Sequence, residues 1–184
     1  MNFKVREAVK EDLVFVSSIV EEIAYWAKFR STGVTSRTTT YVQQKIEEGL
    51  ALIAMDEQGD WIGFCYLETW EHGKYVANSG LIVLPAYRNT GLAFQLKQMA
   101  LQVAARKFPQ AKVFSLTTNL SVAKINHELG YKVIPYDQLL KDEYFVKGCG
   151  QVLDYPKMVQ THAGDTECFI MVYDPAVMRL KKVS

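Results

Sequence analysis

The stretch best suited to chemistry is residues 88–93, where an arginine is followed by a glycine and then by an alanine. An apolar run, residues 81–84, precedes it, and apolar residues at helical spacing begin at Leu92. The first N–H groups of a helix have no acceptor within the helix, and the helix dipole favours negative charge there. Gly91 permits close approach to the backbone, and Ala93 leaves room beside it. The sequence therefore predicts an anion-binding site at the start of this helix.

Two arginines suggest a second kind of chemistry, because Arg30 and Arg37 bracket a short polar loop, residues 31–36. A guanidinium group binds a carboxylate through two parallel hydrogen bonds and keeps its charge when partly desolvated. The pair could therefore clamp a carboxylate group of a substrate. Two arginines in water are the alternative, and the sequence leaves both open.

Metal and disulfide chemistry have less support. The chain has three cysteines, at positions 65, 149 and 168. Cys149, His162 and Cys168 match no zinc spacing, and they would not complete a set of four ligands. We therefore expect no metal site. An odd, sparse set of cysteines is typical of a reducing compartment rather than of a disulfide framework.

Composition indicates one globular domain over residues 1–184. Of the 184 residues, 49% are hydrophobic and 22% charged, which is enough for a sizeable core. The net charge of +1 gives no indication of a nucleic-acid or membrane partner. The sequence has no bilayer-spanning apolar run and no secretory hydrophobic region, so we expect a cytoplasmic protein. The oligomeric state stays open, with a homodimer as one option.

The spacing of apolar residues predicts the elements that position these groups. We expect strands at residues 3–9, 50–56, 61–70, 75–84, 113–118, 131–135 and 168–174. We expect helices at residues 10–30, 36–48 and 92–108, and a fourth between an N-cap at Asn119 and a glycine C-cap at Gly130. Residues 137–167 are interpreted as an insertion before the last strand, with a short helix at 142–145 and a turn at 148–150.

Two motifs resemble the GNAT superfamily of N-acetyltransferases. The first is Leu-x-Val-x-Pro at residues 81–85 followed by Arg-x-x-Gly-x-Ala at residues 88–93, which is similar to the acetyl-coenzyme A signature. The second is the strand–helix–Gly–aromatic–strand unit that ends at Gly130 and Tyr131. An ordinary strand-to-helix loop is the alternative for the first motif. The resemblance covers roughly residues 3–136 and 168–174.

The resemblance implies an α/β fold: a mixed, mostly antiparallel twisted sheet of about seven strands, with helices on both faces. It implies acetyl-CoA as co-substrate, with its pantetheine along a strand edge and its pyrophosphate on the loop N–H groups. The implied cofactor-binding residues are Leu81, Ile82, Val83, Arg88, Asn89, Thr90, Gly91, Leu92, Ala93, Asn119, Ala123 and Asn126. The resemblance also places the loop between Arg30 and Arg37 beside the acceptor, so both become candidate substrate-binding residues.

The chain departs from the superfamily where protons are moved. Many members carry a tyrosine four residues before the glycine of the second motif, as general acid for the thiolate, and this chain has Asn126 there. An amide donates a hydrogen bond but no proton at neutral pH. Many members also carry a glutamate base on the fourth strand. The matching residues 76–79 have no carboxylate, and Ser79 is the catalytic candidate among them.

Glu68 is the first substitute for the missing base. It follows aromatic residues on one strand face, where desolvation would raise its pKa; a carboxylate that reaches solvent is the alternative. His127 could shuttle a proton, but it points about 100° away from Asn126 on a helix. An exposed histidine is the alternative. Asn126 is a candidate contact to the cofactor or its sulfur, with a core or capping amide as the alternative.

These features predict an N-acetyltransferase that moves an acetyl group from acetyl-CoA to a primary amine of a small metabolite. The arginines favour an amino acid such as glutamate, as in an N-acylglutamate synthase-like role. A non-catalytic acyl-CoA-binding module would explain the missing tyrosine and glutamate. A protein or polyamine acetyltransferase is the third interpretation.

Overall fold

The structure is a computed structural model that describes residues 2–30, 37–135 and 169–176. The predicted insertion, with its expected helix and turn, lies outside these residues. The same holds for Cys149, His162 and Cys168. The role of this segment therefore stays a prediction.

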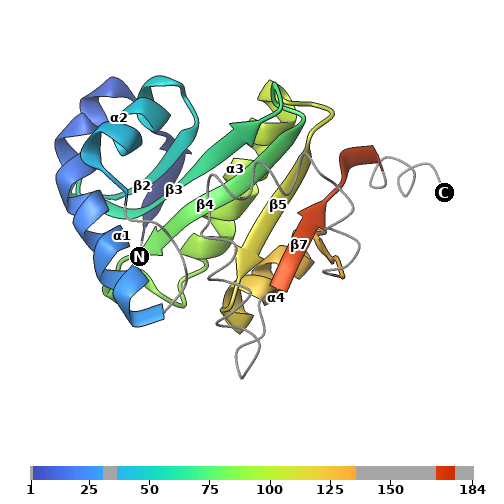
Figure 1. The fold of residues 1–184 in the computed structure, drawn as a ribbon. Coiled ribbons are helices and arrows are strands. Elements are labelled where there is room, and N and C mark those ends of the chain that lie inside the picture. Colours follow the sequence, from blue (N-terminus) through green and yellow to red (C-terminus); the bar gives the residue numbers. More distant parts are fainter. Residues whose placement is uncertain (1, 31–36, 136–168, 177–184) are drawn as a thin grey trace. The chain divides into compact units, whose positions relative to one another are not determined.

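Within the described residues, seven strands form one sheet in the order β1-β2-β3-β4-β5-β7-β6 (Figure 1). The strands are β1 Phe3–Glu7, β2 Ala51–Asp56, β3 Trp61–Trp70, β4 Tyr75–Val83, β5 Lys112–Thr117, β6 Lys132–Val133 and β7 Phe169–Tyr173. β4 and β5 pair in parallel, whereas β1–β2, β2–β3, β5–β7 and β6–β7 pair antiparallel. The mixed, mostly antiparallel sheet expected from the sequence is confirmed.

The helices agree with the expected order but differ at their starts. They are α1 Val16–Arg30, α2 Thr39–Glu47, α3 Leu92–Lys107 and α4 Leu120–Glu128, with 3-10 turns η1 Lys10–Phe15 and η2 Pro85–Tyr87. The predicted helix at 10–30 is wrong in its first turns, which form η1. The helix expected from residue 36 begins at Thr39, because the Thr38 side chain caps it by accepting from the Tyr41 N–H.

The described chain divides into two compact units, and the first comprises Met1–Arg30, Ser36–Glu68 and Asn78–Val103. In this unit, apolar residues of α1 and α2 pack against one face of β2, β3 and β4, among them Ile19, Ile23, Val42, Ile46, Ile53, Phe64, Tyr66 and Ile82. α3 packs on the other face of β3. A Cβ at Gly63 would lie 2.9 Å from Leu96 Cδ1, so a glycine here permits the close approach of α3.

Of the described residues, the second unit comprises 69–77, 104–135 and 169–176. Its core is an aromatic and aliphatic cluster on β4, β5 and β7 that includes Tyr75, Ala77, Phe114, Ile170 and Val172. The Trp70 ring stacks on the Tyr75 ring with centroids 5.6 Å apart. The first residues of β4 pair in parallel with the first residues of β5, with Tyr75 opposite Lys112.

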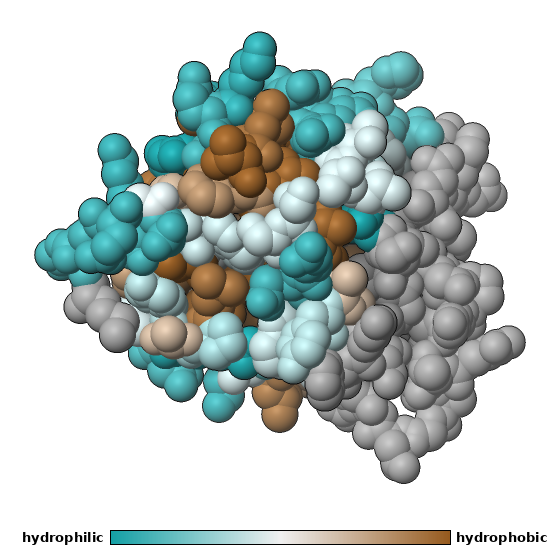
Figure 2. Space-filling view, turned by 90° about the vertical axis from the view of Figure 1, so that its left-hand side faces the viewer, coloured by the Kyte–Doolittle hydropathy of each residue, from teal (hydrophilic) through white to brown (hydrophobic). Residues whose placement is uncertain are grey.

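The exposed apolar side chains of the described residues do not identify a binding surface. Figure 2 shows the side of the molecule on which α1 and α2 lie, where hydrophobic areas alternate with hydrophilic ones. The large apolar residues with most exposure are Val9, Val14, Tyr25, Leu120 and Val133. Scattered residues of this kind are usual on protein surfaces. No helix in the described ranges has both the length and the apolar character needed to cross a membrane.

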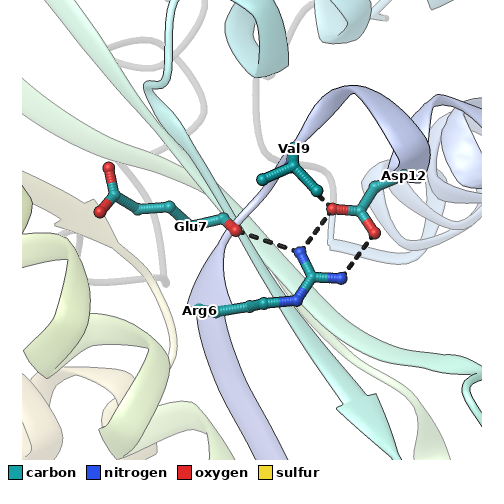
Figure 3. A network of polar contacts seen from close by, with 4 residues as sticks. All are labelled: Arg6, Glu7, Val9 and Asp12. Carbon is teal, nitrogen blue, oxygen red and sulfur yellow. Dashed lines mark hydrogen bonds and ion pairs between the residues drawn. The ribbon is translucent and has the colours of Figure 1, made fainter.

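A buried ion pair holds η1 against β1 (Figure 3). Arg6 donates from Nη1 to Asp12 Oδ2 at 2.6 Å and from Nη2 to Oδ1 at 2.8 Å, and Asp12 Oδ2 also accepts from the Val9 N–H. The Asp12 side chain is 3% exposed. Burial raises the pKa of Asp12, but the hydrogen bonds from Arg6 and Val9 outweigh that effect and hold it below its ordinary 3.8.

Replacement of Asp12 by alanine should lower the free energy of unfolding by about 2 kcal/mol, because the charge-assisted hydrogen bonds of Asp12 with Arg6 and the Val9 N–H are lost. A carboxylate with a depressed pKa stabilises the fold above its unfolded-state pKa, and this contribution disappears as pH falls through the folded-state value. D12A lacks this carboxylate. As the pH falls from about 4 to the folded-state pKa of Asp12, D12A should therefore lose less stability than the wild type. Urea unfolding at several pH values measures both effects. The exposed neighbour Glu11 is the control, and an equal loss in E11A would contradict the interpretation.

Candidate functional site

The predicted anion loop has the conformation that its sequence suggests. Gly91 has φ +84°, and a Cβ placed on it would meet no atom within 4 Å, so the loop is open to a ligand at this point. The Gln95 N–H donates to the Gly91 carbonyl at 3.1 Å, so Gly91 is the N-cap residue of α3, directly before Leu92. The N–H groups of the first turn of α3 therefore have no acceptor within the helix. Open space, free donors and the helix dipole together suit a phosphate group.

The polar side chains of this loop serve the protein's own structure. Thr90 donates from its hydroxyl to the Tyr87 carbonyl at 2.7 Å. Arg88 donates from Nε to the Val83 carbonyl at 3.3 Å, and its guanidinium lies 4.1 Å from the centroid of the Trp26 ring. Asn89 has a φ of +62°, which asparagine tolerates better than most residues. A ligand at this loop would therefore be held chiefly by main-chain N–H groups.

The apolar residues assigned to the cofactor are buried or half-buried. Leu92 is 1% exposed and packs into the core, and Ile82 is 5% exposed in the cluster beneath α1 and α2. Leu81, Val83 and Ala93 are half-buried. Their expected contacts to a ligand, which the sequence describes as backbone contacts, stay a prediction.

Glu68 is buried near the end of β3, so the alternative of a solvent-reaching carboxylate is wrong. Its residue exposure is 5%, and its Oε2 lies 3.0 Å from Lys45 Nζ of α2. The other oxygen, Oε1, is buried and has no hydrogen-bond partner among the described residues. Burial raises the pKa of Glu68 to about 7, and the charge of Arg37 opposes the rise. A carboxyl group that titrates near neutral pH can act as a general base.

Arg37 and Tyr66 complete this cluster. Arg37 donates from Nε to the Tyr66 hydroxyl at 2.7 Å, and its guanidinium lies 5.0 Å from the centroid of the Tyr41 ring. Arginine has no acceptor, so the Tyr66 oxygen accepts here and its own proton points elsewhere. The Tyr66 ring covers Gly80 of β4, where a Cβ would lie 2.1 Å from the ring. The structure thus brings two predicted residues, Glu68 and Arg37, into one cluster.

The second predicted arginine cannot be assessed in the same way. Arg30 is the last residue of α1, and its side chain lies outside the described part of the chain. Ser79, the catalytic candidate on β4, is half-buried. The roles assigned to both residues stay predictions.

A buried lysine lies on the α3 side of β4. Lys97 is 1% exposed and donates from Nζ to Asn78 Oδ1 at 2.6 Å. Burial lowers the pKa of Lys97 to about 8 and raises that of the nearby Cys65 thiol to about 11. Asn78 belongs to residues 76–79, the part of the strand where many superfamily members carry a glutamate base. In this protein an amide occupies that part of the strand, and it contacts the amine of Lys97 on α3.

The α4 residues belong to the second unit, and the structure favours the structural alternative for two of them. Asn119 caps α4 by accepting from the Ser121 N–H at 2.8 Å, as the sequence predicts. Asn126 is fully buried and donates from Nδ2 to Ser115 Oγ at 3.0 Å, so its amide is a core group. Ala123 is half-buried and His127 is exposed. Cofactor contacts of Asn119, Ala123 and Asn126 stay predictions.

Sequence analysis missed Lys45 and Lys97, although each leaves a signal in the chain. Lys45 precedes Ile46 and follows Val42 by three positions, so it lies on the buried stripe of α2. Lys97 has Ala100 and Ala104, both fully buried, at the next helical positions of α3. A lysine on an apolar stripe indicates a buried amine that needs a partner.

The family is decided by a match over most of the chain. Residues 20–131, which include the anion loop, Glu68 and Asn126, match the Acetyltransferase (GNAT) family. The chain belongs to this family. The resemblance stated from the two motifs is confirmed, and its acetyltransferase class with it. No curated protein sequence matches the chain.

Solved structures share the GNAT fold with this protein at low sequence identity. N-acetylglutamate synthase from Neisseria gonorrhoeae, complexed with coenzyme A and N-acetyl-glutamate, aligns with a TM-score of 0.65 at 17% identity. The alignment covers 95% of this chain and 35% of the synthase, so this chain spans about a third of that protein. Rv2747 from Mycobacterium tuberculosis, in complex with CoA, aligns with a TM-score of 0.66 at 17% identity over 93% of this chain and 98% of that chain.

A third similar structure is the GNAT superfamily phosphinothricin acetyltransferase from Sinorhizobium meliloti, in complex with AcCoA. Its TM-score is 0.60 at 18% identity, over 73% of this chain and 77% of that chain. At these identities the similarity shows the fold. The three solved structures contain CoA or acetyl-CoA, so the fold that they share with this protein holds that group in those proteins.

Proposed function

We propose that this protein transfers an acetyl group from acetyl-CoA to the primary amine of a small metabolite, with an amino acid such as glutamate as the first candidate. The observation that carries this proposal is the buried Glu68 carboxyl group, which has one oxygen on Lys45 and one without a partner. Family membership supplies the acetyltransferase class. The solved relatives in complex with CoA or acetyl-CoA support the choice of acyl donor.

The anion loop fits the phosphate groups of coenzyme A. The space at Gly91 is open, and the N–H groups of Gly91, Leu92 and Ala93 lie at the positive end of α3. Residues 81–83 of β4, which lie beyond the residues 75–77 that pair with β5, would hold the pantetheine arm by main-chain hydrogen bonds. When bound, acetyl-CoA supplies a thioester as the activated acetyl group. The loop and the strand would hold that thioester in place, and proximity to the amine supplies much of the rate.

Glu68 is the residue proposed to act on the acceptor amine. An amine is protonated at neutral pH and is nucleophilic only after it loses a proton, which Glu68 Oε1 is placed to accept. The C–N bond then forms as the C–S bond breaks, the nitrogen gives up its second proton, and the sulfur gains one. The Tyr66 hydroxyl, whose oxygen accepts from Arg37, is a phenol of this cluster that can still donate a proton to the sulfur.

Arg37 is the group of the cluster that suits an acceptor with a carboxylate. It lies beside Tyr66 and Tyr41, and its charge acts on Glu68. A guanidinium group keeps its charge when partly desolvated and can bind a carboxylate through two hydrogen bonds, which a polyamine cannot use. The N-acetyl-glutamate in the N. gonorrhoeae synthase structure carries carboxylates of this kind.

One experiment separates the proposal from its rivals. Release of free thiol from acetyl-CoA is measured with a panel of amino acids and polyamines. Acceleration by glutamate over spermidine supports the proposal, and acceleration by spermidine alone would favour a polyamine acetyltransferase. Binding of CoA without acceleration by any amine would favour a non-catalytic acyl-CoA-binding module, the rival that the missing tyrosine and glutamate keep open.

Replacement of Arg37 by alanine should raise the KM for the amino-acid acceptor about tenfold to a hundredfold, the effect of losing one or two charge-assisted hydrogen bonds. A contact to a non-reacting carboxylate persists in the ground and transition states, so kcat should change less. R37K and the exposed Arg106→Ala serve as controls. Arg30→Ala is expected to act like R37A. Unchanged KM in both variants would mean that the carboxylate clamp is wrong.

A further inference from the structure

Lys45 is an unusual neighbour for a catalytic carboxylate because it is itself buried. Its residue exposure is 8%, and its Nζ lies 3.0 Å from Glu68 Oε2 but 3.7 Å from Glu48 Oε2. The Glu48 side chain is 39% exposed, whereas that of Glu68 is 6% exposed. The Glu68 contact is thus both the shorter and the better shielded from water. Ion pairs shielded in this way interact more strongly than exposed ones.

The two oxygens of Glu68 are not equivalent. Lys45 binds Oε2, while Oε1 is buried and has no partner in the described part of the chain. A buried carboxylate oxygen without a donor is costly, so Oε1 would be stabilised by an N–H or O–H group that approaches it. The ion pair therefore determines which oxygen remains for a ligand.

We propose that Lys45 is a positioning residue for Glu68: it binds Oε2 and thereby presents Oε1, in ionised form, as the oxygen that receives the proton of the acceptor amine. This inference rests on the proposed function, in which Glu68 is the base. It adds a residue from α2 to a site otherwise built from β3 and the segment before α2. No motif of the sequence indicated this role.

Several charged and titratable groups face this pair, and the effect of Lys45 has to be separated from theirs. Arg37 acts on Glu68 from the segment before α2 and is hydrogen-bonded to Tyr66 on β3. Glu48 contacts Lys45 from the C-terminal end of α2, and the Tyr41 ring lies 5.2 Å from Lys45 Nζ. Glu48 is the group whose removal gives a matched control.

The test compares the pH dependence of kcat/KM in wild type, K45M, K45R and E48Q. Loss of the ammonium group removes a charge that favours the ionised carboxylate, so the acid limb of K45M should move up by about one to two pH units. At pH 7 its kcat/KM should fall about tenfold and largely recover near pH 9. K45R should keep the wild-type limb, and so should E48Q. An unmoved limb in K45M, or a loss that is equal at every pH, would overturn the inference.

A second measurement does not depend on turnover. The Glu68 carboxyl group is titrated by carbon-13 NMR in wild type and in K45M, and K45Q is used if K45M does not fold. The titration midpoint should rise in the lysine variants and stay unchanged in E48Q. If it rises while no amine accelerates thiol release by wild type, the proposed function fails and the coupling of Lys45 to Glu68 stands. If turnover is present and the midpoint does not move, the inference about Lys45 fails alone.

Discussion

Replacing Glu68 with glutamine is expected to lower kcat for acetyl transfer about a hundredfold to a thousandfold, the usual contribution of a positioned general base. Glutamine keeps the shape of the side chain and can still contact Lys45 through its amide oxygen, but it cannot accept a proton. The affinity for CoA should stay within about threefold, because the proposed phosphate contacts belong to the loop at Gly91. Steady-state kinetics and calorimetric titration with CoA measure the two effects.

The pH profile makes this prediction specific. Burial raises the pKa of Glu68 to about 7, so the protonated, inactive form dominates below that pH. In wild type, kcat/KM should rise about tenfold per pH unit below pH 7 and level off above it. The limb should be absent in E68Q and present in E48Q, which removes the more exposed carboxylate that contacts Lys45 from the end of α2. Retention of more than a third of wild-type activity by E68Q would exclude Glu68 as the base.

The parts of this structure that sequence predicts well are those that depend on neighbours along the chain. β3 has the bounds Trp61–Trp70 that its period of two predicts. Asn119 caps α4, and Gly130 follows that helix with φ +94°, as their residue types indicate. The loop at Gly91 is equally local, since a strand, a proline, a glycine and a helix start follow one another directly. Such signals require no knowledge of the tertiary fold.

Contacts between distant segments account for what the sequence left open. Whether Glu68 is buried depends on α2, because Lys45 comes to it from 23 positions earlier in the chain. The split of the predicted first helix likewise depends on Arg6 of β1, which holds Asp12 in η1. From its position on α4 alone, the Asn126 side chain could contact a ligand or pack in the core. Its pairing with Ser115 of β5 and Met171 of β7 settles where its amide points.

The second large effect is expected at the anion loop, where Gly91→Glu should weaken CoA binding more than about a hundredfold, or about 2.7 kcal/mol. The side chain would enter the open space beside Gly91 and bring a negative charge to the place proposed for the phosphates. The rise of the melting temperature that a bound ligand produces should disappear with it. Calorimetric titration and thermal unfolding with and without CoA measure both consequences.

Backbone strain has to be separated from this effect, because Gly91 has φ +84° and any side chain is disfavoured there. Gly59, in the turn between β2 and β3, is a close match: its φ is +86°, and a Cβ would again meet no atom within 4 Å. Gly59→Glu therefore introduces the same charge at a similar strain in a different turn, which is joined to η2 by the hydrogen bond from the Tyr87 hydroxyl to Asp56. It should lower the melting temperature about as much as G91E and leave CoA affinity unchanged.

Gly91→Ala adds the strain without the charge and should retain most of the binding. If G91E still binds CoA within about tenfold of wild type, or if G59E weakens binding equally, the phosphates do not lie at Gly91 and the assignment of this loop is wrong.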